Sequence, residues 1–143
     1  MSYGQQMRPL VRARLPTTPS MVAVLAGDLL VLFAFVATGQ LSHGYGFWEA
    51  PARTALVTLP VVFGWLLLAI PAGLFVPSRL SSLKRAVPRV VGAWIGAALI
   101  GGAIRSTSLV PGSAPLSFLL ANVVFGTLFL VPWRILVGWR FGR

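Results

Sequence analysis

The fold of this chain is decided by residues 79–104, RLSSLKRAVPRVVGAWIGAALIGGAI, in which a basic stretch leads directly into a long apolar run. Four of the first eleven residues are Arg or Lys, and the stretch contains no acidic residue. Other apolar runs lie on both sides of it, and more basic residues precede the first run and follow the last. Basic residues that flank apolar runs are typical of membrane proteins, whose cytoplasmic loops carry an excess of Lys and Arg.

Four apolar runs approach or exceed the roughly 20 helical residues that cross the hydrocarbon core of a bilayer. They cover about residues 21–38, 54–76, 88–104 and 116–138. We therefore predict an all-α polytopic membrane protein, a single four-helix transmembrane bundle over residues 1–143, with residues 1–19 as a basic tail. A cleaved signal peptide is the alternative interpretation of the first run. That run is longer than a typical signal sequence and contains Asp28, which favours a transmembrane helix.

The distribution of basic residues predicts the orientation of these helices. Ten of the twelve basic residues lie before the first run, between the second and third runs or in the first turn of the third, or in the last turns of the fourth and just after it. The other two, Arg53 and Arg105, flank the runs on the opposite side. The positive-inside rule then places both termini in the cytoplasm of a plasma-membrane protein, beside anionic lipids.

The composition excludes several classes of protein. The chain is 57% hydrophobic and 10% charged, and a soluble domain of 143 residues could not bury that much apolar surface. Despite a net charge of +10 we expect no nucleic-acid binding, because the basic residues bracket apolar runs instead of interleaving with exposed aromatic residues. One His and no Cys exclude a thiol site and a zinc site, and the two acidic residues, Asp28 and Glu49, are expected at different depths in the membrane, which excludes a carboxylate pair. We therefore expect no enzyme activity, no metal and no cofactor.

Polar residues within the apolar runs are the strongest functional candidates, because each is costly in lipid unless it is paired or solvated. Asp28 lies about seven residues into the first run and Arg134 about five residues before the end of the fourth. These positions give the two residues a similar depth, and we predict that they form an ion pair. Alternatively, Asp28 is a protonatable site for permeation. Arg105 and Asn122 are further candidates, although an arginine near an interface often serves only as an anchor.

A second candidate group lies in the predicted outer loop. His43, Glu49 and Arg53 occur within eleven residues, and Arg105 approaches the same side of the membrane. These four side chains could form a polar site at the outer surface. A solvated loop without a specific site is the ordinary alternative, since exposed charges contribute little when they meet.

The third run differs from the others because small residues cover most of its circumference. Small residues allow the backbones of neighbouring helices to approach closely, as in small-xxx-small motifs. This predicts a helix at the centre of the packing. The residues expected at its contacts are Gly92, Gly96, Ala97 and Gly101.

Prolines and tryptophans give more local expectations. Pro60 and Pro71 predict kinks in the second run, because proline removes a backbone donor. Trp65 and Trp94 lie inside the runs and are expected to fill the interior. Trp133 is expected to lie in an interfacial belt.

Short motifs in and beside the four runs occur together in one known family. They are Gly27-Asp28, Ser42-His43-Gly44, Phe63-Gly64-Trp65, Trp94 with Gly102 and Arg105, Ser117-Phe118, and Trp133-Arg134. In order and spacing, over about residues 22–140, the chain resembles an uncharacterised family of small prokaryotic four-helix membrane proteins. The resemblance implies four spans without an established activity, and it adds weight to Asp28, His43, Arg105 and Arg134.

Two classes of function fit these observations. The first is a non-catalytic accessory or assembly subunit, which docks its third helix and its basic face against a membrane-protein partner or a second copy. The second is a small permease or ion pathway that uses Asp28. A dimer of oppositely oriented copies is disfavoured, because it needs balanced basic charge on the two sides of the membrane.

Overall fold

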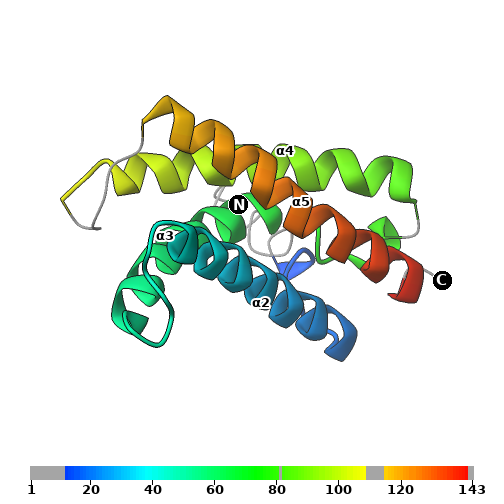
Figure 1. The fold of residues 1–143 in the computed structure, drawn as a ribbon. Coiled ribbons are helices and arrows are strands. Elements are labelled where there is room, and N and C mark those ends of the chain that lie inside the picture. Colours follow the sequence, from blue (N-terminus) through cyan, green and yellow to red (C-terminus); the bar gives the residue numbers. More distant parts are fainter. Residues whose placement is uncertain (1–11, 81, 109–114, 142–143) are drawn as a thin grey trace, which may run out of the picture.

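The computed structural model describes residues 12–80, 82–108 and 115–141 (Figure 1). Arg8, Arg143 and the first eleven positions of the predicted basic tail lie outside the described residues. Every regular element within the described ranges is helical, as predicted. The elements are α2 (Pro19–Ser42), α3 (Pro51–Ala69), the 3-10 turn η1 (Pro77–Arg79), α4 (Leu83–Arg105) and α5 (Leu116–Phe141). All four α-helices are long and apolar enough to cross a membrane.

The first helix begins where the sequence provides a cap. Thr18 has an extended backbone, and its side-chain oxygen accepts a hydrogen bond from the backbone N–H of Met21 at 3.2 Å. Pro19 occupies the first turn, where its missing N–H costs nothing. The helix then continues four residues beyond the predicted end, to Ser42.

The second predicted run is shorter as a helix than the sequence suggested. We expected it to continue to residue 76 with a kink at Pro71, but α3 ends at Ala69. Pro71 cannot continue the helix, and the chain turns at Gly73, whose φ of 75° is readily adopted only by glycine. The turn directs Leu74 and Phe75 back into the core, where both are buried.

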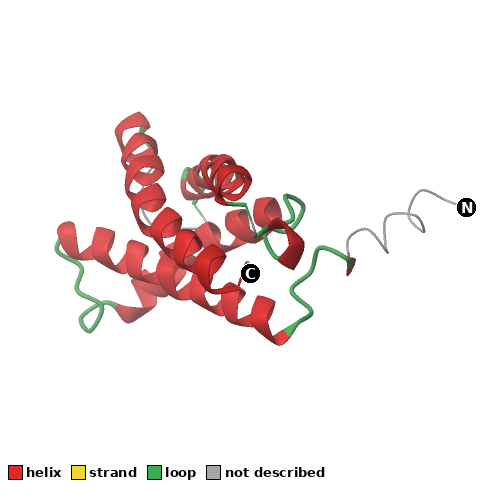
Figure 2. Ribbon diagram, turned by 90° about the vertical axis from the view of Figure 1, so that its right-hand side faces the viewer, coloured by secondary structure: helices red, strands yellow, loops and turns green. Residues whose placement is uncertain are grey.

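The four helices form a closed ring in the order α2, α3, α4, α5, since α2 and α4 each contact both α3 and α5. Figure 1 shows α5 passing across α4 and beside α2, and Figure 2 shows that the helices cross one another. We call the end that contains residues 70–80 the basic end, because most of the described basic residues lie there. The opposite end contains residues 43–50 and 106–108.

The backbones of α3 and α4 come close together at Gly64. A Cβ on Gly64 of α3 would lie 2.7 Å from the carbonyl oxygen of Ala97 on α4, so only glycine fits there. Ala97 and Gly101 are buried and Gly96 contacts Leu68, in agreement with the predicted packing.

The prediction for Gly92 is wrong within the chain. Gly92 is exposed, and a Cβ added to it would meet no atom of the described residues within 4 Å. The small residues that face α3 lie on a different side of α4, which leaves Gly92 on the outer surface of the ring.

Candidate functional site

The predicted ion pair between Asp28 and Arg134 is confirmed. Arg134 Nη2 lies 2.5 Å from Asp28 Oδ2, and Arg134 Nε donates to Oδ1 at 3.0 Å. These two bonds join α2 to α5 with the paired geometry that a guanidinium and a carboxylate favour. The exposed fraction of Asp28 is 0% and that of Arg134 is 3%, so the pair lies inside the bundle.

Three further groups complete what we call the Asp28 network: Trp65, Trp133 and the carbonyl oxygen of Leu74. Trp65 Nε1 donates to Asp28 Oδ2 at 3.0 Å, and Trp133 Nε1 donates to Oδ1 at 2.8 Å. Arg134 Nη1 donates to the Leu74 carbonyl oxygen at 2.7 Å. The carboxylate therefore accepts four hydrogen bonds, which offset much of the cost of burying its charge.

Two further residues support the Asp28 network: Phe75 packs against the Arg134 guanidinium, and Gly27 leaves space for the Trp133 indole. The Arg134 guanidinium carbon lies 5.1 Å from the centre of the Phe75 ring, close enough for a cation–π contact. Gly27 lies beneath the Trp133 indole, because a Cβ on Gly27 would come within 1.9 Å of that ring. The contact between Gly27 and Trp133 thus lies directly beside the ion pair, because Gly27 precedes Asp28 and Trp133 precedes Arg134.

Sequence reasoning placed Trp133 in an interfacial belt, and this was wrong. Its indole N–H points into the bundle, where it and the adjacent Arg134 both donate to Asp28 Oδ1. Trp65 was expected inside, where it lies, but its hydrogen bond was not foreseen. The sequence did contain a signal for the Trp133 bond: Gly27-Asp28 and Trp133-Arg134 lie at a similar depth in the first and fourth runs.

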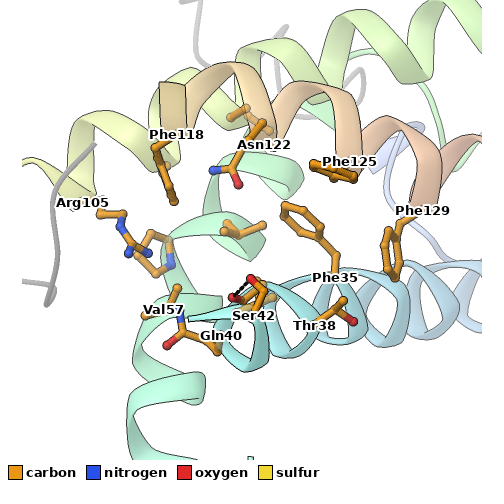
Figure 3. Close-up of a pocket in the computed structure, with 18 of the residues that line it drawn as sticks. Phe35, Thr38, Gln40, Ser42, Val57, Arg105, Phe118, Asn122, Phe125 and Phe129 are labelled. Atoms are coloured by element: carbon orange, nitrogen blue, oxygen red, sulfur yellow. Dashed lines mark hydrogen bonds between the residues drawn. The ribbon is translucent and has the colours of Figure 1, made fainter. Parts of the chain in front are cut away.

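A separate cavity of about 400 Å³ lies between the helices toward the opposite end. All four α-helices line it (Figure 3). The residues that give the cavity its character are Phe35, Gln40 and His43 near and after the end of α2, Trp94 and Arg105 of α4, and Phe118, Asn122, Phe125 and Phe129 of α5.

The cavity collects some of the predicted outer residues and not others. His43 and Arg105 line it, and Arg105 lies 4.4 Å above the Phe118 ring. Arg53 is connected to it indirectly, because Arg53 Nε donates to Gln40 Oε1 at 3.1 Å. Glu49 is exposed and is not a lining residue, so the predicted cluster of four does not form as one group.

Asn122, the remaining predicted polar residue, lies on the cavity wall. Its backbone oxygen accepts a hydrogen bond from Trp94 Nε1 at 3.0 Å. Sequence reasoning missed the phenylalanines beside it, which resemble ordinary lipid-facing residues. Phe118, Phe125 and Phe129 are seven and four residues apart, and this spacing places them on one face of α5.

No curated protein and no solved structure matches this chain. The family described as "Protein of unknown function (DUF3054)" matches residues 25–137. The matched segment contains the whole Asp28 network and every residue that lines the cavity. It confirms the resemblance carried by the short motifs, and the chain therefore belongs to the DUF3054 family.

Proposed function

We propose that this chain is a non-catalytic accessory or assembly subunit of the plasma membrane, which docks a helix of a partner membrane protein on α4. The observation that carries the proposal is the exposure of Gly92. Gly96 follows one turn later and is only half-buried, with Leu68 as its neighbour. The exposed glycine suits the close approach of another helix, and Gly96 lies at the border between this outer face and the contact with α3.

The surroundings of Gly92 support a protein partner. Ile95 and Leu99 are exposed on the same helix, with exposed fractions of 39% and 56%. Lys84 and Arg85, two turns earlier, are exposed at the basic end. A partner with an apolar helix followed by an acidic cytoplasmic segment would complement both features, and anionic lipids would neutralise basic residues that the partner leaves uncovered.

The environment of Asp28 weighs against the permease hypothesis. A coupling acid has to exchange protons with a solvated pathway. Asp28 has no exposed surface and already binds a guanidinium and two indole N–H groups. This arrangement favours a structural role for the acid, which supports the subunit hypothesis.

A single-cysteine variant tests the docking surface. The chain has no native cysteine, so Gly92→Cys introduces a unique thiol for a photoactivatable cross-linker. We expect one stoichiometric cross-linked partner in native membranes, and we expect Gly92→Leu to remove that partner from the purified protein. Leu30→Cys is the control, because Leu30 is exposed on α2, away from α4.

Two outcomes would contradict the subunit hypothesis. One is equal cross-linking at Gly92→Cys and Leu30→Cys. The other is a purified protein without a foreign partner that takes up solute into vesicles in a proton-dependent manner. In this outcome Asp28→Asn abolishes the uptake. The second outcome would establish the permease instead.

We further propose that both termini lie in the cytoplasm, and reporter fusions test this orientation. The basic end carries Arg79, Lys84, Arg85 and Arg140, whereas Arg53 and Arg105 lie toward the opposite end. Fusions after Ser82 and after the last residue should report a cytoplasmic location, and a fusion at Tyr45 should report an external one. A cytoplasmic signal at Tyr45 would refute the orientation.

A further inference from the structure

The cavity near the opposite end takes no part in the proposed docking on α4, and its lining has two chemically different parts. Figure 3 shows Arg105 and Gln40 at one end and Phe35 and Phe129 toward the other. The aromatic part is ordered by ring contacts, since Phe35 lies 5.5 Å from Trp94 and 5.8 Å from Phe129, in each case edge to face. One end is therefore polar and the other is an aromatic wall.

The size of the cavity limits what can fill it. Its volume of about 400 Å³ lies within the range of roughly 300–1,000 Å³ that is usual for small-molecule sites. At roughly 30 Å³ for each carbon-sized group, a value taken from liquid water, the cavity holds about a dozen such groups. This volume suits one apolar chain.

The polar end of the cavity offers donors and positive charge. Arg105 is always cationic, and His43 presents a ring N–H in either tautomer. The Ser42 hydroxyl donates its hydrogen to the Gly39 carbonyl oxygen of its own helix at 2.7 Å, so it adds no donor here. The acid nearest in sequence, Glu49, does not line the cavity. This end therefore complements an anion.

A polar group on the cavity wall also points to a ligand. The side chain of Asn122 makes no hydrogen bond within the part of the chain that the structure describes. The residue is half-buried on the cavity wall, and its amide is accessible from the cavity. A bound molecule with a polar group near its head would satisfy it.

We propose that the cavity binds a single-chain anionic amphiphile, with its carboxylate or phosphate head at Arg105 and His43 and its chain along Phe35 and Trp94. The length agrees with this placement. Trp94 precedes Arg105 by eleven residues on α4, which is about 16 Å along the helix axis. A chain of about a dozen carbons spans that distance, so its far end reaches the Trp94 indole.

Fluorescence quenching by 11-bromoundecanoate tests the proposal, because the terminal bromine of the probe would lie against Trp94. In the intact chain in lipid nanodiscs we expect saturable quenching of tryptophan emission. Arg105→Gln should weaken the apparent affinity about tenfold or more, as expected for loss of a charged hydrogen-bonding partner. Ala121→Phe, which fills the cavity from α5, should also abolish saturable quenching.

Two controls separate binding from partition into lipid. Arg140→Gln removes an arginine that also lies over a phenylalanine, at 5.2 Å from Phe141, but that does not line the cavity, and its affinity should equal that of the unmodified chain. The uncharged 11-bromoundecanol should quench without saturation. Equal, unsaturable quenching by the acid and the alcohol, unaffected by Arg105→Gln, would refute the proposal. Displacement of the probe by inorganic phosphate alone would also refute it, because the ligand would then be a soluble anion.

Discussion

Arg134→Ala should be among the most destabilising single substitutions in this protein, with a loss of about 3–5 kcal/mol in the free energy of unfolding. The substitution removes two hydrogen bonds to Asp28 and one to the Leu74 carbonyl. It leaves the Asp28 carboxylate inside the bundle with only two indole donors and without its counter-charge. Since proteins are stabilised by only about 5–15 kcal/mol, this loss is a large share of the total. Unfolding of the purified protein in mixed detergent measures it.

A double-mutant cycle shows whether the lost stability comes from the interaction between Asp28 and Arg134. Asp28→Ala should also be strongly destabilising, because it leaves Arg134 buried without its anion. The double variant should lose less stability than the sum of the two single variants, since neither charge then remains uncompensated. Arg140→Ala, an exposed arginine on the same helix, should have little effect. Simple additivity of the two single losses would contradict a structural pair.

The ion pair was predictable because depth in the membrane follows from counting along a helix. Asp28 and Arg134 lie at similar distances from one end of their helices, and in a ring of four the first and last helices are neighbours. Counting residues along a helix does not predict the orientation of the neighbouring Trp133 indole. The donation from Trp133 depends on the space above Gly27, which is a property of packing between α2 and α5 rather than of either sequence segment alone.

The faces of α4 were less predictable for a related reason. When small residues cover most of a helix, composition cannot indicate which side meets a neighbour. The structure separates Ala97 and Gly101, which face α3, from Gly92, which faces outward. The cavity could not be predicted either. It arises where the side chains of four crossing helices leave space, and no single helix encodes that space.

The second large effect is expected at Gly64. A Cβ there would lie 2.7 Å from the backbone oxygen of Ala97, and a backbone atom cannot move aside as the end of a side chain can. Gly64→Ala should therefore separate α3 from α4 and cost about 1–3 kcal/mol, and Gly64→Leu should prevent folding. Thermal unfolding of Gly64→Ala and the yield of monodisperse Gly64→Leu measure the two effects. Both indoles of the core, Trp65 and Trp94, lie beside this contact, so their fluorescence should shift as well.

Two other glycines of the same helix pair provide matched controls of graded severity. A Cβ on Gly101 would lie 3.7 Å from the Pro60 oxygen, an ordinary van der Waals distance, so Gly101→Ala should be nearly neutral and Gly101→Leu destabilising. Gly92→Leu should not lower the stability, because outside the neighbouring backbone of α4 no described atom lies within 4 Å of an added Cβ. Intrinsic helix propensity alone predicts that replacing any of these helical glycines with alanine, Gly64 included, stabilises the protein by about 1 kcal/mol. We therefore expect Gly92→Ala to stabilise the protein, and an equal gain in Gly64→Ala would refute the close contact between α3 and α4. A loss of stability at Gly64 alone would show that backbone contact outweighs propensity there.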